Sequence, residues 1–173
     1  MTKQIELRRH TDNDGDVLTP AGVAAAIEVG ARLAGGYRLI ASSGAQRATQ
    51  TAGCMLAGLG EQVPGGVVIV AGLRSSREEE WRAAYRKAGQ GDLDSLRQAD
   101  RELVDEDSAA LAEGLRWLMS QLEDGEHALA VGHSPTNEAA VFGLSGIVIP
   151  PMGKGQGVIV VKSDDGYSVE AVE

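Results

Sequence analysis

The sequence predicts an α/β protein with three layers, in which helices cover both faces of a mostly parallel sheet. Short apolar segments typical of buried strands alternate with longer segments of helical periodicity along most of the chain. Several of these strands end in polar residues that directly precede a predicted helix, as in a βα unit. The last two strands, 158–161 and 167–172, are joined by Ser163-Asp164-Asp165-Gly166, a hairpin signal that predicts an antiparallel C-terminal edge.

The composition indicates one domain and narrows the choice of partners. A length of 173 residues predicts a single domain over 1–173, with a small helical insertion at about 75–107. With 16 Lys+Arg against 25 Asp+Glu the net charge is −9, which disfavours nucleic acid and membrane as partners. The lone Cys54 excludes a disulfide framework and a cysteine-based zinc site. No apolar run approaches the ~20 residues that span a bilayer, and the first residues lack a signal-peptide core, so we expect a cytoplasmic protein.

The first predicted strand ends in a basic residue and a histidine. Ile5 and Leu7 alternate as in a strand, and the polar turn 11–15 stops it. Arg9 and His10 therefore lie at a strand's carboxyl end, where open α/β sheets bind ligands. Arginine offers a fork of donors that matches phosphate oxygens, and a neutral imidazole can attack phosphorus. Taken alone, this segment favours a surface arginine pair beside a structural histidine, and two later segments change that interpretation.

A helix and a second strand follow. Thr19 is a good N-cap and Pro20 suits the first helical position, so we expect a helix that continues to about residue 34. Gly35-Gly36 ends it, and 37–41 reads as a short strand. The residues that we expect on the buried side of this helix are Val23, Ile27 and Leu33.

The segment 42–52 places an arginine where its charge is unfavourable. Ser42 or Ser43 can cap a helix that continues to about residue 59, which puts Arg47 in the first helical turn. A cation there opposes the helix dipole. A bound anion, held by free backbone N–H groups and by the Arg47 guanidinium, would explain the position. The alternative is an ordinary arginine that faces solvent.

The middle of the chain supplies further elements. The β-branched run 67–70 predicts a fully buried strand. Ser76 and Glu79 form a capping-box pattern that predicts a helix to about residue 87, and this gives the Glu78–Glu80 triplet a structural role at a helix start. A short helix near 93–97 and a longer one at 108–122 follow, the latter from leucines three and four residues apart.

A third strand ends in a histidine. The buried-type strand 128–131 is followed by Gly132-His133-Ser134 and then by a helix at about 136–144. Because the carboxyl ends of parallel strands meet at one edge of a sheet, we expect His10, Arg47 and His133 to converge there.

At these three segments the chain resembles the histidine phosphatase superfamily, the phosphoglycerate-mutase-like group. The shared signatures are Arg9-His10 after the first strand, the Ser-Ser…Arg…Thr-Ala segment around Arg47, and Gly132-His133 late in the chain. The compact length and the Ile149-Pro150-Pro151-Met152 segment look most like the small branch that includes SixA-type phosphohistidine phosphatases. The resemblance implies that His10 is the nucleophile, that Arg9 and Arg47 clamp the phosphoryl oxygens, and that His133 donates to them.

The same resemblance implies no metal and no other cofactor, and a phosphorylated small molecule or a phosphoprotein as substrate. The chain departs from the family pattern in two places. Thr11 follows the nucleophile where the family has Gly, and Ser75 stands where the family has its proton-donating Glu. Glu78 is the nearest substitute, and the other candidates are Glu79, Glu80 and Glu138. A missing acid favours good leaving groups, as in phosphoramidates or activated phosphates.

The sequence therefore predicts a phosphatase that hydrolyses phosphate monoesters or phosphohistidine through a phosphohistidine on His10. One alternative is a phosphoglycerate-type mutase. Another is a catalytically weak phosphate-binding or regulatory module on the same fold. A nucleotide-binding α/β protein is disfavoured, because no Gly-x-Gly-x-x-Gly follows the first strand.

Overall fold

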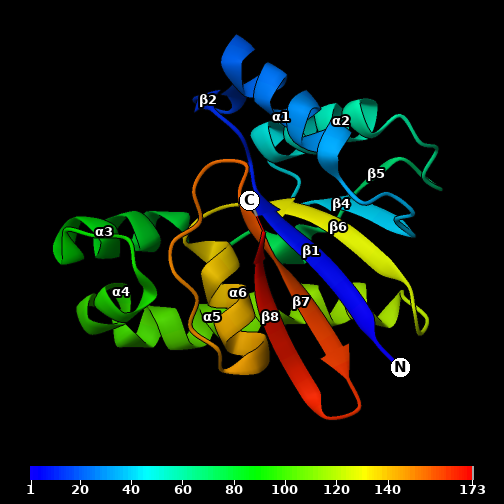
Figure 1. The fold of residues 1–173 in the computed structure, drawn as a ribbon. Helices are drawn as coiled ribbons and strands as arrows, with labels where there is room; N and C mark the ends of the chain where they lie inside the picture. Colours follow the sequence, from blue (N-terminus) through cyan, green and yellow to red (C-terminus); the bar gives the residue numbers. More distant parts are fainter. Residues whose placement is uncertain (173) are drawn as a thin grey trace.

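A computed structural model describes residues 1–172, and a six-stranded sheet lies at its centre (Figure 1). The order across the sheet is β5-β4-β6-β1-β7-β8. The strands are β1 (Lys3–Arg9), β4 (Leu39–Ser42), β5 (Val67–Ile69), β6 (His127–Gly132), β7 (Gly157–Ser163) and β8 (Gly166–Val172). The pairs within β5-β4-β6-β1 are parallel, and β7 pairs antiparallel with both β1 and β8. The predicted mostly parallel sheet with an antiparallel C-terminal edge is confirmed.

Helices cover both faces of this sheet, which confirms the predicted three layers (Figure 1). One face carries α1 (Pro20–Arg32) and α2 (Gln46–Leu59). The other carries α5 (Arg101–Ser120) and α6 (Thr136–Ser145), with α3 (Glu78–Ala88) and α4 (Leu93–Ala99) beside them. The remaining elements are the 3₁₀ turn η1 (Ala71–Leu73) and the small hairpin of β2 (Asn13–Asp14) and β3 (Val17–Leu18). No helix within residues 1–172 is both long and apolar enough to cross a membrane.

Helix α1 begins as predicted but buries a different face. The Thr19 hydroxyl accepts the N–H of Gly22 at 3.0 Å, as an N-cap should. Of the expected core residues, Val23 and Ile27 are 37% and 42% exposed, so the prediction was wrong for them, whereas Leu33 is partly buried and packs against the core. The residues that pack inward are Gly22, Ala26, Val29 and Gly30. A Cβ on Gly30 would overlap the backbone oxygen of Met55, so small residues let the backbones of α1 and α2 approach closely.

Two further expectations, about strand β5 and about the start of helix α2, were wrong. Strand β5 is an edge strand, and Ile69 is 64% exposed rather than fully buried. The N-cap of α2 is Ala45, so neither serine caps the helix. Ser42 and Ser43 instead accept the N–H groups of Gly44 and Ala45, and so shape the loop between β4 and α2.

Two helix starts on the other face also differ from the sequence pattern. Helix α3 begins after Arg77, and the expected capping box at Ser76 does not form, because the Ser75 hydroxyl accepts the Arg77 N–H at 2.9 Å. Helix α5 begins at Arg101 rather than near 108, capped by the Asp100 carboxylate, which accepts the Leu103 N–H at 3.1 Å. The earlier start brings Asp107 into the helix on its buried side.

Candidate active site

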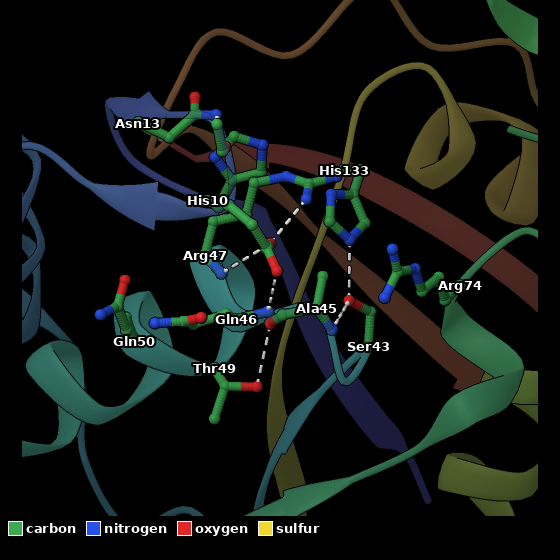
Figure 2. Close-up of polar contacts among 12 residues, drawn as sticks. His10, Asn13, Ser43, Ala45, Gln46, Arg47, Thr49, Gln50, Arg74 and His133 are labelled. Atoms are coloured by element: carbon green, nitrogen blue, oxygen red, sulfur yellow. Dashed lines mark hydrogen bonds and ion pairs between the residues drawn. The ribbon is translucent and has the colours of Figure 1, made fainter. Parts of the chain in front are cut away.

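The two histidines named by the sequence lie together because their strands are neighbours. Strands β1 and β6 pair in parallel, and their last residues, Arg9 and Gly132, lie opposite each other. The residue that follows each strand is a histidine, so His10 and His133 also lie side by side. The His10 N–H donates to the Gly132 carbonyl at 3.0 Å, which ties the two strand ends. The His10 and His133 rings lie edge to face with centroids 5.3 Å apart (Figure 2). The structure therefore brings the two imidazoles to one edge of the sheet.

His10 is held as a neutral imidazole with a defined tautomer. Its Nδ1 lies 2.8 Å from the Thr11 carbonyl oxygen, which can only accept, so Nδ1 carries the proton and Nε2 the lone pair. Burial lowers the pKa of His10 from 6.5 to about 4; the Thr11 hydrogen bond opposes this, and the charges of Arg47 and Arg9 reinforce it. At neutral pH this side chain has what a nucleophile at phosphorus requires.

Thr11, which stands in place of the family's glycine, anchors the loop after His10. Its hydroxyl donates to the Gly22 carbonyl at 2.8 Å, and its backbone N–H donates to the Thr51 hydroxyl at 3.2 Å. Both contacts fix this loop to α1 and α2. The Thr11 carbonyl is thereby held in place to orient His10.

His133 is oriented by a serine from the neighbouring loop. Its Nε2 lies 2.7 Å from the Ser43 hydroxyl oxygen, while Nδ1 is buried and has no hydrogen-bond partner among residues 1–172. Burial lowers the pKa of His133 from 6.5 to about 3, with further lowering from Arg47, His10 and Arg74. His133 is therefore neutral in the free protein, and an incoming dianion would favour its protonation.

Two of the predicted arginines lie close enough to His10 to lower its pKa. Arg9 is fixed by an Nη1 hydrogen bond to the Met152 carbonyl at 3.0 Å, and its Nε is buried with no partner within residues 1–172. Arg47, in the first turn of α2 as predicted, also lowers the pKa of His133. With His10 and His133, these side chains complete the predicted group of two imidazoles and two guanidiniums.

The anion expected at the start of α2 is a side chain of the protein itself. The Asp16 carboxylate, from the turn between β2 and β3, accepts the N–H groups of Gln46 and Arg47 at 3.4 and 3.3 Å. It also pairs with the Arg47 guanidinium at 2.8 Å. Neither sequence interpretation of Arg47 anticipated this partner. An internal carboxylate resolves the unfavourable placement of the cation, and a substrate phosphoryl group would compete with it.

Replacing Asp16 with asparagine is expected to tighten the binding of inorganic phosphate or vanadate by about fivefold, because a competing ion pair worth about 1 kcal/mol is removed. Titration calorimetry measures this affinity. The matched control is Asp12→Asn, since Asp12 lies near the same hairpin but pairs with Lys154 at 2.8 Å. Weaker anion binding in Asp16→Asn would instead mean that Asp16 holds Arg47 in its binding position.

The four candidate proton donors lie in different surroundings. Glu78 lines a cavity of about 230 Å³ together with Arg47 and His133, and it accepts from Arg74 Nε at 2.7 Å. Glu79 pairs with Arg82 and Glu80 with Arg77, both on the exposed side of α3. Glu138 is 1% exposed and accepts the Met152 N–H at 2.8 Å. Burial raises the pKa of Glu138. Glu78 is thus the one of the four that reaches the cavity.

Ser75, at the position where the family pattern has a glutamate, donates a hydrogen bond to a buried aspartate. Its hydroxyl donates to Asp107 Oδ2 at 2.6 Å, and Trp81 Nε1 donates to the same oxygen at 2.6 Å. Asp107 was missed because the helix that contains it was expected to begin at 108, whereas α5 begins at Arg101 and has Asp107 on its buried side. The Ser75 proton points to Asp107, so Ser75 does not replace the acid.

Arg74 is a second residue that sequence reasoning missed. It lies beyond Ser43 and His133 as seen in Figure 2, and its charge lowers the pKa of His133. Its position directly before Ser75, in the segment already singled out for the proton donor, was the available signal. With Arg47, Arg74 is the second guanidinium that lowers the pKa of His133.

The two buried imidazoles predict that the fold loses stability in mild acid. Because their folded pKa values of about 4 and 3 lie below the ordinary 6.5, the unfolded chain binds protons that the folded chain does not. The free energy of unfolding therefore falls as the pH drops from about 6.5 towards 4. Urea unfolding across this range measures the slope, which we expect to be shallower in His133→Gln. An equal slope in His133→Gln would contradict a lowered pKa of His133 in the folded protein.

The arrangement of strands and helices is the histidine phosphatase, or phosphoglycerate-mutase-like, fold. Solved structures match the chain along nearly its whole length. Phosphoglycerate mutase from Bacillus anthracis str. Sterne matches with a TM-score of 0.74 at 18% identity, covering 99% of this chain and 92% of that one. Phosphoserine phosphatase from Entamoeba histolytica, in complex with 3-phosphoglyceric acid, matches with a TM-score of 0.74 at 19% identity, covering 99% and 97%.

The protein histidine phosphatase SixA, complexed with tungstate, matches with a TM-score of 0.59 at 17% identity, covering 96% of this chain and 94% of that one. The lower score means that the fold does not specifically favour the SixA branch suggested by chain length. No protein-family profile matches the sequence, and no curated protein matches it.

Proposed function

We propose that the protein is a phosphatase that hydrolyses phosphate monoesters or phosphohistidine through a covalent phosphohistidine on His10. The observation that carries this proposal is the neutral His10, its Nδ1 tied to Thr11 and its lone pair on Nε2, beside His133 and Arg47. Likeness to the phosphoserine phosphatase and SixA folds supports the same class of reaction.

In the first step His10 Nε2 attacks phosphorus, the N–P bond forms, and the bond from phosphorus to the leaving group breaks. Arg9 and Arg47 neutralise charge on the equatorial oxygens, and His133 donates a hydrogen bond once the dianion has favoured its protonation. Arg47 becomes available when the phosphoryl group displaces Asp16. Such positioning and charge stabilisation provide most of the catalysis in phosphoryl transfer, and the scheme uses no metal ion.

In the second step water attacks the phosphohistidine, the N–P bond breaks, and phosphate leaves.

Glu78 is our candidate for the proton donor to the leaving group of the first step, since it is the one carboxylate of the four that lines the cavity. Glu78 is paired with Arg74 Nε at 2.7 Å, so it must leave this ion pair before it can reach the leaving group. The leaving groups handled best are then those that need little protonation.

The test is to trap the intermediate. The protein is mixed with p-nitrophenyl phosphate, quenched in alkali, in which phosphohistidine survives, and digested for mass spectrometry. A phosphoryl group on His10, with a burst of nitrophenol before steady turnover, is the expected result. Turnover without a modified His10 would overturn the proposal. Phosphate binding without hydrolysis of any phosphoester or phosphohistidine peptide would instead support the regulatory module.

A further inference from the structure

The residues that line the cavity beside His133 restrict the chemical class of the leaving group that the site can accept. It has a volume of about 230 Å³ and shares His133 and Arg47 with the proposed phosphoryl site. A phosphoryl group held by these two side chains would therefore direct the rest of the substrate into the cavity. The cavity is large enough for a compact group.

The walls of the cavity are mainly apolar. Trp81 and Tyr85 contribute from one side of α3, where residues four apart share a face. Pro135 faces them from the start of α6. Tyr85 is 53% exposed, so one of the two rings has an uncovered surface, whereas Trp81 is 4% exposed and fixed by its hydrogen bond to Asp107. The exposed ring of Tyr85 is therefore the aromatic surface on which a planar group could stack.

The charged groups at the cavity are already paired with one another. Glu78 accepts from Arg74 at 2.7 Å and lies 3.8 Å from Arg82, which also pairs with Glu79. A substrate carboxylate would have to displace Glu78 or Glu79 to pair with Arg82. An uncharged planar group would bury apolar surface and leave these ion pairs intact.

We infer that the preferred substrates are phosphate monoesters of a compact aromatic alcohol, whose ring packs against the exposed ring of Tyr85. This inference rests on the proposed function and names its substrate class. In the transfer, the N–P bond to His10 forms as the bond from phosphorus to the aryl oxygen breaks. The aryloxide leaves with the bonding electrons and takes its proton from water. A phenol, with a pKa of about 10, needs less protonation than an alkyl alcohol, as suits a site whose Ser75 proton is committed to Asp107.

The test compares binding of phosphonates that do not turn over, so that the intrinsic reactivity of aryl esters does not enter. Phenylphosphonate is expected to bind about tenfold or more tightly than methylphosphonate and 2-hydroxyethylphosphonate, because its ring is buried. Tyr85→Ala should remove this difference and Tyr85→Phe should retain it. Trp117→Ala, which removes an exposed ring on α5, is the control and should change nothing. A phosphotyrosine peptide as a further ligand distinguishes a protein source of the aryl phosphate from a small molecule.

Equal affinities for the three phosphonates, or tighter binding of the hydroxyethyl compound, would overturn the inference while leaving His10 as the proposed nucleophile. Retention of the preference in Tyr85→Ala would overturn it as well. A failure of the proposed function has a different signature, because trapping then finds no phosphohistidine although the aryl preference in binding remains.

Discussion

Replacing His10 with alanine is expected to lower kcat/KM for p-nitrophenyl phosphate by at least about 10³-fold, because the nucleophile of the proposed covalent route is lost. Arg9, Arg47 and His133 remain, so the variant should still bind inorganic phosphate. The combination of retained binding and lost turnover separates loss of the nucleophile from loss of the site. Initial rates and titration calorimetry measure the two quantities.

The matched control for this variant is His127→Ala. His127 lies at the opposite end of β6, where its Nε2 is 2.7 Å from the Gly35 carbonyl oxygen and its ring contacts Tyr37. The His127→Ala variant removes an imidazole from the sheet without touching the site. Its activity should therefore stay within a few-fold of that of the unmodified protein. Activity of His10→Ala near that of the control would refute a phosphohistidine on His10.

Replacing Gly30 with alanine is expected to lower the free energy of unfolding by about 3 kcal/mol, since an overpacked contact forces two helix backbones apart. The added Cβ would overlap the Met55 carbonyl oxygen, and backbone atoms cannot turn away as a side chain would. Urea unfolding measures the change. The same substitution should disturb the site only indirectly, through the start of α2.

The control for this variant is Gly53→Ala on the facing helix. Gly53 lies inside α2, and a Cβ there meets no atom within 4 Å. Alanine should therefore stabilise the protein by about 0.5–1 kcal/mol through its higher helix propensity. Equal effects of the two substitutions would show that the close approach of α1 and α2 is not what glycine provides at position 30.

The sequence predicted the sheet and the meeting of His10, Arg47 and His133 because these depend on local signals. Apolar runs mark the strands, polar residues mark their ends, and parallel strands align those ends. The buried side of α1 was not predictable in the same way. Hydrophobicity favours Val23 and Ile27, whereas the close approach of two helices selects glycine and alanine. Packing between segments distant in sequence decided that face.

The surroundings of the site were less predictable than its centre. The contact of Asp16 with Arg47 comes from a hairpin of two-residue strands, which is too short to leave a periodic pattern. The carboxylate of Asp107 reaches Ser75 from a helix whose start was misplaced by seven residues relative to the expected 108. In both cases a single polar side chain contacts a segment that is distant in sequence, and no pattern of residues along the chain indicates such a contact.

The position of β1 between β6 and β7 also sets when the site comes into existence during synthesis (Figure 1). The strand that carries His10 emerges first, but both of its neighbours are encoded far downstream: Gln4 pairs with His127 on one side and with Val161 on the other. Contacts so distant along the chain make folding slow and late. The two imidazoles of the site can therefore meet only after the segment that contains β6 and His133 has been synthesised.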